Sequence, residues 1–365
     1  MPYGQINADQ ISTSVSGYSL GAGNSSLMKN KIINGSMTID QRNAGASVTP
    51  ANLQYTVDRF RVAISQSSKF TVQQNAGSVT PPAGFTNYLG VTSSSAYSVT
   101  STDYFLIGQP IEGYNMADLG WGTADAKTVT LSFWVRSSLT GTFGGSINNN
   151  AYNRCYPFSY TISSANTWTQ ISVTIAGDTT GTWEKTTSTG MYVWFGLGVG
   201  STNLGTANTW AGAAYYSPTG ATSVVGTNGA TFYITGVQLE VGSSATGFEY
   251  RQYGQELALC QRYYTIIKGT ASNPTCGVGT QASTTVVAGQ IPLPVSMRTT
   301  SPTITGCVSA TDAFAYNQGV TLTANETLNN CLYISGTIPA NGAAGRATLF
   351  LLNGTTAAIG IATEL

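Results

Sequence analysis

Apolar and polar residues alternate in short runs along most of this chain. The run 128–138 (TVTLSFWVRSS) places its apolar residues on one face, and the run 191–200 (MYVWFGLGVG) does the same. A third run, 167–183, ends in the turn AGDTTG. Alternation with period two is the pattern of a strand with one buried face. Many such runs between glycine-rich turns over residues 31–249 predict a two-sheet sandwich of jelly-roll type.

The same alternation predicts which side chains face the core. The inward residues of the first two runs are Val129, Leu131, Phe133 and Val135, then Met191, Val193, Phe195, Leu197 and Val199. The opposite faces carry Trp134 on one strand and Tyr192 and Trp194 on the other. We therefore expect aromatic rings on faces that are not the obvious core.

A charged segment separates two β-rich regions. Five charged residues fall within residues 240–262, although only 8% of the chain is charged. Within it, YGQELALCQRYY (253–264) predicts a short helix with Gly254 as N-cap. The expected apolar stripe of this helix is Tyr253, Leu257, Cys260 and Tyr264. A short helix is marginal alone, so the stripe must dock, either on its own sandwich or on identical helices around a three-fold axis.

The regions outside the sandwich and the helix complete the predicted organisation. Residues 1–30 are polar and rich in glycine and serine, which favours an attachment arm held by a partner chain. The sandwich is expected over 31–249 and the junction helix over 250–268. Residues 269–365 return to β texture and predict a second, C-terminal β-sandwich domain. The expected fold class is all-β.

Composition excludes several classes of partner. The 365 residues have a formal net charge of zero with scattered cations, so the positive stripe that nucleic acid requires is missing. No apolar run reaches the roughly 18 to 20 residues of a membrane span, so we expect no membrane insertion. At 41% hydrophobic residues the chain can bury real cores.

The residue types also exclude most catalytic chemistry. The chain has no histidine, which rules out Ser-His-Asp and Cys-His sites and histidine-ligated metals. Its five cysteines form no CxxC pair, so we expect reduced thiols, no zinc site and no cofactor. No spacing of carboxylates along the sequence indicates a catalytic pair for glycoside cleavage. We expect a protein that is not an enzyme.

Several segments resemble a known family. These are NKIINGSMTIDQRNAG (30–45), YTVDRFRV (55–62), TVTLSFWVRSSLTGTF (128–143), WTQISVTIAGDTTGTW (168–183), ITGVQLEVGSSATGFEYRQYGQELALCQRYY (234–264) and PLPVSMRTTSPTITG (292–306). Together they are similar to tailed-bacteriophage virion proteins, described as tail fibre or head-associated structural proteins. The resemblance implies a jelly roll like that of carbohydrate-binding modules, a junction helix and a C-terminal β domain.

The resemblance also implies roles for particular residues. The matching charged and turn positions are Asn34, Gly35, Gln41, Arg42, Asp58, Arg59, Glu249, Arg251, Glu256 and Arg262. We expect them to hold the sandwich to the helix through ion pairs and hydrogen bonds, because so few charges are normally placed with partners.

Candidate glycan contacts come from the strand pattern. Aromatic rings can stack on the apolar faces of sugars, and Trp134, Tyr192 and Trp194 would form a platform if their strands are neighbours. The alternative is that loops, the helix or another subunit cover these residues. Loop aromatics are rival candidates, namely Trp183, Trp210, Tyr215 and Tyr216. A calcium ion at turn carboxylates such as Asp178 stays open, without a supporting motif.

The expected function is a bacteriophage virion structural protein on the outside of the particle. As a tail fibre or spike-type adhesin, it would form a homotrimer, attach to other virion proteins through its N-terminal arm and bind host-surface polysaccharide. The alternatives are a capsid or neck decoration protein, of head-fibre type, that binds no sugar, and a glycan-cleaving enzyme. Exposed aromatic faces would indicate the adhesin, and buried ones the decoration protein. A cleft with two carboxylates would indicate the enzyme.

Overall fold

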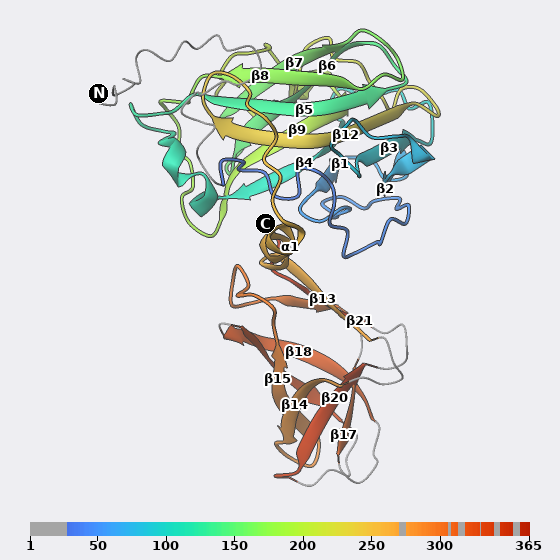
Figure 1. Ribbon diagram of the computed structural model, residues 1–365, viewed down its shortest axis with the longest axis vertical. Coiled ribbons are helices and arrows are strands. Elements are labelled where there is room, and N and C mark those ends of the chain that lie inside the picture. Colours follow the sequence, from blue (N-terminus) through green and yellow to red (C-terminus); the bar gives the residue numbers. More distant parts are fainter. Residues whose placement is uncertain are drawn as a thin grey trace, which may run out of the picture.

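The computed structural model describes residues 28–269, 275–305, 308–312, 318–328, 330–338, 344–352 and 358–365. A sandwich of two sheets lies at one end, a barrel lies at the other, and the helix α1 (Tyr253–Gln261) lies between them (Figure 1). The predicted attachment arm, residues 1–30, lies outside the described residues except for its last three.

Two five-stranded sheets form the sandwich. The β9 sheet has the order β1 (Arg61–Ile64), β4 (Tyr104–Glu112), β9 (Thr189–Val199), β6 (Gly141–Asn149) and β7 (Cys155–Ile162). The β12 sheet has the order β2 (Phe70–Gln74), β3 (Leu89–Ser93), β12 (Thr231–Val241), β5 (Val129–Ser137) and β8 (Thr169–Ile175). Short elements join them: β10 (Leu204–Gly205), β11 (Ser217–Pro218) and 3₁₀ turns at Ala76–Ser78, Gly113–Asn115, Ala117–Leu119 and Ser201–Asn203.

The core of the sandwich lies between the two sheets. Phe133 of β5 meets Phe195 of β9 edge to face, with ring centroids 5.0 Å apart. The inward residues predicted on these two strands are buried, except that Val199 at the end of β9 is partly exposed. Each large side chain buried in this way contributes roughly 1.5 to 3 kcal/mol. The all-β class and the jelly-roll sandwich are confirmed.

The C-terminal strands form a closed barrel, where we had expected a second sandwich. Its order is β14 (Thr275–Gln281), β15 (Val286–Pro292), β19 (Cys331–Thr337), β18 (Gln318–Leu328), β17 (Val308–Asp312) and β20 (Ala347–Leu352). Each of these strands pairs with the next, and the last, β20, pairs with the first, β14, so the sheet closes on itself and leaves no open edge among the described strands. Next to the helix lies a three-stranded sheet of β13 (Tyr264–Lys268), β21 (Ala358–Ala362) and β16 (Thr303–Thr305).

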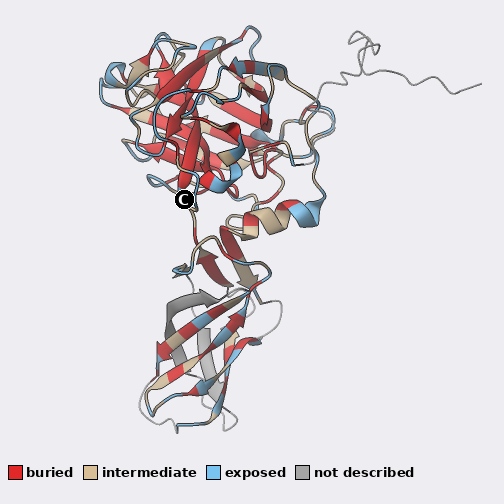
Figure 2. Ribbon diagram, turned by 90° about the vertical axis from the view of Figure 1, so that its left-hand side faces the viewer, coloured by how far each residue is buried: buried red, intermediate tan, exposed pale blue. Residues whose placement is uncertain are grey.

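The helix differs from the prediction at both ends. Gln252 is the N-cap, not Gly254, and it makes no side-chain capping bond. The first residues of α1 are exposed (Figure 2). Tyr253 among them is 63% exposed, so it is not part of a buried stripe. The helix ends at Gln261, which places Tyr264 in β13, where it is buried.

The buried side of the helix packs on its own chain. Cys260 and Tyr263 form a cluster with Ile33 and Ile39 of the segment before β1, and Leu257 packs against it. The helix therefore docks on the sandwich of its own chain, one of the two alternatives given above. A contact of the predicted oligomer residues with further copies of the chain stays a prediction.

Ion pairs join the sandwich to the region beyond the helix. Arg262, directly after α1, donates two hydrogen bonds to the Glu112 carboxylate at 3.0 and 2.7 Å, and the Tyr263 hydroxyl donates a third at 2.6 Å. Arg59 pairs with Glu364, and its guanidinium lies 3.5 Å from the ring centre of Tyr263. Four of these five side chains are at most 11% exposed. They hold the two parts of the molecule together.

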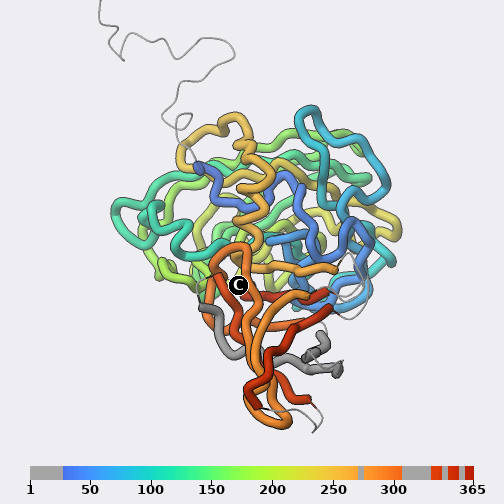
Figure 3. The backbone as a smooth tube through the Cα atoms, turned by 60° about the horizontal axis from the view of Figure 1, so that its bottom comes forward, coloured from blue at the N-terminus to red at the C-terminus, as the bar shows by residue number. Residues whose placement is uncertain are grey.

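A second set of polar contacts extends this junction. Arg42 pairs with Glu364 at 2.7 Å, and Gln41 donates to Asp58 at 2.9 Å. Leu365, at the end of the described chain, receives a hydrogen bond from the Tyr55 hydroxyl at its main-chain oxygen. Figures 1 and 3 both place this end of the chain where the sandwich meets the C-terminal strands. The charged positions of the resemblance thus serve in structural contacts.

Three further features bear on function. Cys155, Cys260, Cys276 and Cys331 are free thiols. Within the described ranges, no group of histidine, cysteine and carboxylate side chains has the arrangement of a metal site. No helix among those residues is long and apolar enough to cross a membrane.

Candidate functional site

The three aromatic residues predicted as a glycan platform do not lie together. Trp134 is on β5 of the β12 sheet, whereas Tyr192 and Trp194 are on β9 of the β9 sheet. Their strands are therefore not neighbours, and the condition on which the platform rested is not met. Trp194 is 0% exposed and Tyr192 is 7% exposed.

Other aromatic side chains cover the outer face of the β9 sheet. Tyr152 stacks on Tyr192 with ring centroids 4.8 Å apart, and Tyr192 stacks on Trp194 at 5.5 Å. Tyr216 packs against Tyr152, and the Arg61 guanidinium lies 5.2 Å from the centre of the Tyr192 ring. The face is a second hydrophobic cluster within the protein. Within it, Tyr192 and Trp194 are covered and offer no open ring face to a sugar.

The loop tryptophans pack on one another, with Trp183 buried and Trp210 partly exposed. Trp121, Trp183 and Trp210 pack edge to face, with centroids 4.8 to 5.7 Å apart. The indole N–H of Trp183 donates to Asp178 at 3.0 Å, and Asp178 also pairs with Arg154 at 2.7 Å. This carboxylate is thus engaged with its own chain.

Trp134 lies near Phe85, one of the residues that line an open pocket. It is half-buried, and Gly236 on the adjoining strand β12 lies between it and Phe85. A Cβ added at Gly236 would stand 2.6 Å from the Phe85 ring and 3.1 Å from Trp134. Gly236 has a φ of +62°, so the absence of a side chain permits both the bulge and this close approach.

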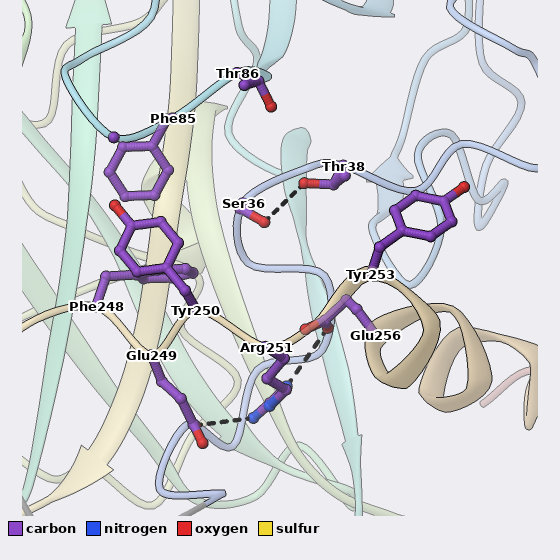
Figure 4. A pocket seen from close by; sticks show the side chains of 11 residues that line it. Ser36, Thr38, Phe85, Thr86, Phe248, Glu249, Tyr250, Arg251, Tyr253 and Glu256 are labelled. Atoms are coloured by element: carbon purple, nitrogen blue, oxygen red, sulfur yellow. Dashed lines mark hydrogen bonds and ion pairs between the residues drawn. The ribbon is translucent and has the colours of Figure 1, made fainter.

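The pocket has a volume of about 130 Å³ and opens beside the start of α1 (Figure 4). This volume is below the size of a pocket for a drug-sized ligand. It is lined by Ser36, Thr38, Gly84, Phe85, Thr86, Phe248, Glu249, Tyr250, Arg251, Tyr253 and Glu256.

Aromatic rings form one wall of the pocket. Phe85, Phe248 and Tyr250 make a three-way cluster with centroids 5.0 to 5.6 Å apart. Tyr250 and Tyr253 are 61% and 63% exposed, so both rings face solvent. The two exposed tyrosines flank the pocket, and Phe85 with Phe248 supports one of them.

The local chain geometry positions Tyr250. The turn before Phe85 is closed by a hydrogen bond from the Phe85 N–H to the Pro82 carbonyl at 3.0 Å. Gly84 in this turn has a φ of +89°, and an added Cβ would stand 2.5 Å from the Tyr250 hydroxyl oxygen. The tyrosine hydroxyl therefore lies on a backbone position that only glycine suits.

Polar groups form the rest of the lining. The Ser36 and Thr38 hydroxyls are hydrogen bonded at 2.9 Å (Figure 4). Arg251 bridges the two carboxylates, 3.3 Å from Glu249 and 3.4 Å from Glu256. These three charged side chains are at most 14% exposed. The pocket thus combines exposed rings with hydroxyls and fixed charges.

The carboxylates are built into the fold. Glu249 accepts the N–H groups of Met28 and Asn30 at 2.6 and 2.8 Å. Glu256 accepts the N–H of Asn34, and its Oε1 also takes the Arg251 contact. These bonds tie the segment 28–34 to the chain that enters the helix.

A second pocket lies on another side of the same junction. It has a volume of about 320 Å³ and also contacts Arg251. Its rim carries Tyr114, which is 60% exposed, and an ion pair between Lys31 and Asp118 at 2.8 Å. It has one exposed aromatic ring, where the first pocket has two and a supporting cluster.

Sequence reasoning missed Phe85, Phe248 and Tyr250 as site residues. One signal was present, because residues 248–251 read FEYR, an alternation of aromatic and charged side chains. In an extended segment this places Phe248 and Tyr250 on one side and the charges on the other. No local pattern indicates Phe85, which reaches the pocket through a loop.

Comparison with known proteins gave no family model that matches the chain and no match among curated proteins. Among solved structures, the enzymatically active domain of bacteriophage CBA120 tailspike protein 4 has 12% identity and a TM-score of 0.34, over 59% of this chain. The match spans only 22% of that tailspike chain.

Two carbohydrate-binding modules are also similar. A structure described as CBM4 has 14% identity and a TM-score of 0.31, and the match covers 57% of this chain and 98% of that one. TmCBM61, solved in complex with β-1,4-galactotriose, has 11% identity and a TM-score of 0.30, over 58% and 99% of the two chains. Identity and TM-score are low in all three, so no residue here takes a role from them.

Proposed function

We propose that this chain is a non-catalytic bacteriophage virion protein, of tail fibre or spike type, that binds one sugar residue of a host-surface glycan in the pocket beside α1. The virion role is supported by the sequence resemblance over residues 30–306. The glycan site rests on one observation: two solvent-facing tyrosines flank a small pocket that also carries hydroxyls and carboxylates.

The chemistry of the pocket suits a sugar ring. A pyranose presents C–H groups on its face and hydroxyls at its edge, so it needs an aromatic surface next to hydrogen-bonding groups. Tyr250, supported by Phe85 and Phe248, supplies the surface. Ser36, Thr38 and Glu256 supply partners for hydroxyls. A pocket of about 130 Å³ favours a single ring and weak affinity. Repetition of the site on a particle would raise avidity without any new contact.

The state of the two carboxylates supports a role without catalysis. A retaining or inverting glycosidase needs one carboxyl that donates a proton and a second that acts as nucleophile or base. Both oxygens of Glu249 accept main-chain N–H groups, and Oε1 of Glu256 accepts another. Groups bonded in this way are held as acceptors by the fold.

A decoration or head-fibre protein that binds no sugar is the second candidate. It is favoured by exposed apolar residues on the barrel, where Val278 and Leu349 are cross-strand partners and are 60% and 44% exposed. Such a pair suits a contact between subunits. The two candidates differ in whether the isolated protein adsorbs to cells.

The test is adsorption of the fluorescently labelled full chain to host cells, with extracted surface polysaccharide as competitor. Tyr250→Ala and Tyr253→Ala are the site variants, and Tyr333→Ala, an exposed tyrosine on β19 of the barrel, is the matched control. We expect saturable adsorption of the wild type, and the polysaccharide should compete with it. Both site variants should adsorb at least tenfold less, and the control should adsorb like the wild type. If a folded protein does not adsorb to hosts known to be infected, the decoration role takes its place.

A further inference from the structure

We infer that the pocket beside α1 selects neutral or amino sugars and discriminates against sugars that carry a carboxylate. This inference rests on the proposed glycan site and specifies its ligand class. It comes from the charges around the pocket and from which of them are already used by the fold.

The only cation among the residues that line this pocket is not free to bind a ligand. Arg251 is 4% exposed, and its two terminal nitrogens donate to the main-chain oxygens of Ile32 and Asn30 and to both carboxylates. An acidic sugar is normally bound by an exposed arginine or lysine that offers a pair of N–H groups. The terminal nitrogens of Arg251 are therefore engaged within the protein, and its Nε, which has no partner among the described residues, is buried.

The nearby lysines are also paired. Lys29 lies 3.7 Å from Glu240 and donates to the Gly247 carbonyl at 2.9 Å. Lys31 pairs with Asp118 in the second pocket. The lining of the first pocket therefore carries two carboxylates against one guanidinium, a formal charge of −1.

One carboxylate oxygen remains for a ligand. Both oxygens of Glu249 and Oε1 of Glu256 accept hydrogen bonds. Oε2 of Glu256 makes none within the part of the chain that the structure describes, although Glu256 lines the pocket. A hydroxyl can donate to this oxygen, and an ammonium can donate with the added attraction of its charge. A carboxylate can donate nothing, and it would be repelled.

The start of α1 opposes this selection only weakly. The first N–H groups of a helix carry a partial positive charge that favours anions, equivalent to about half an elementary charge. This partial charge is smaller than the formal charge of −1 on the lining, which already includes Glu256 in the first turn of the helix. The sum at the pocket therefore remains negative, and the effect of the charge should weaken as salt is raised.

The experiment measures ligand-observed NMR binding of three classes of sugar to the full chain: glucose and galactose, their 2-amino forms, and their uronates. At low salt we expect the amino sugars to bind as tightly as the neutral sugars or more tightly, and the uronates at least tenfold more weakly. Raising sodium chloride from 50 to 500 mM should shrink the difference. Tyr250→Ala should weaken all three classes together, because stacking does not depend on charge.

A charge variant isolates the cause. Glu256→Gln keeps an oxygen for the Asn34 N–H and removes the net negative charge, so the uronates should gain relative to the neutral rings by about tenfold. Its melting temperature, compared with that of the wild type, reports whether the junction is intact. If this variant unfolds, the salt dependence of the wild-type selectivity tests whether charge causes the selection.

The outcomes separate the two claims. If uronates bind as tightly as neutral rings at low salt, the charge selection is overturned and the sugar site stands. If no ring binds, or if Tyr250→Ala changes nothing, the proposed site itself is wrong and the inference falls with it.

Discussion

Asp58 gives the sharpest prediction about stability. Its side chain is 1% exposed. Its Oδ2 accepts the main-chain and side-chain N–H groups of Gln41 at 3.2 and 2.9 Å. Its Oδ1 makes no hydrogen bond and lies 3.9 Å from the Arg42 Nε. Burial raises the pKa of Asp58 from 3.8 to about 7, against the opposing effects of Gln41 and Arg42. The ionised carboxylate is therefore poorly accommodated in the folded state.

The sign and size of the effect follow from proton linkage. Because the folded pKa of Asp58 is above the unfolded one, the folded state binds the proton more tightly. The stability from this group is fully present below about pH 4 and is lost as the pH rises toward 7. A difference of about three pH units corresponds to about 4 kcal/mol in all, of which roughly 2 to 3 kcal/mol falls between pH 5 and 7.

The assay is urea unfolding of the wild type and Asp58→Asn at pH 5, 6, 7 and 8, followed by tryptophan fluorescence. The side chain at position 58 of the variant cannot ionise. We therefore expect the free energy of unfolding of the variant, relative to that of the wild type, to rise by about 2 to 3 kcal/mol from pH 5 to 7 and then to level off.

Asp103→Asn is the matched control. Burial alone would raise the pKa of Asp103, but hydrogen bonds from Ser65, Thr100 and Tyr97 lower it to about 2. Its stabilisation is present above about pH 4 and is lost only as the pH falls toward 2. The difference between this variant and the wild type should therefore be flat from pH 5 to 8. A flat difference for Asp58→Asn over the same range would refute the reasoning.

Three further substitutions test the rest of the account. Glu112→Ala should lower the free energy of unfolding by about 3 to 5 kcal/mol in urea titrations, because it leaves Arg262 and Tyr263 without their shared acceptor; a loss under 1 kcal/mol would contradict the junction described here. Trp194→Ala should cost about 3 to 5 kcal/mol in the same assay, and an unaffected protein would mean that the outer face of the β9 sheet is open. Gly84→Ala should weaken sugar binding in ligand-observed NMR by displacing the Tyr250 hydroxyl, with a loss of about 1 to 2 kcal/mol in stability; unchanged affinity would show that the position of that hydroxyl does not matter.

The sequence predicted the inner faces of the strands because burial imposes a period of two. Phe133 and Phe195 alternate with residues of the outer faces of their sheets, and both are in the core. The outer faces could not be predicted in the same way. Nothing local indicates that β5 and β9 belong to different sheets, or that Tyr152 closes over Tyr192. Those facts depend on strand order and on loops.

The junction was predicted in its residues but not in its contacts. The excess of charge over residues 240–262 predicted a structural segment, and Glu249, Arg251, Glu256 and Arg262 make ion pairs there. The partners of these charges, Glu112 for Arg262 and Asn30 for Glu249, lie 150 and 219 positions away in the sequence. Likewise, the helix ends before Tyr264 because that residue pairs with Ala362 in a sheet. Contacts of this range are fixed by the fold.

The most direct test of the central claim is a crystal structure of the full chain soaked with the sugar that binds best in solution. The account predicts electron density for one ring stacked on Tyr250, with a hydroxyl or ammonium group within hydrogen-bond distance of Glu256. Density at the second pocket beside Tyr114, or on the barrel, would contradict it and would place the binding function elsewhere on the molecule.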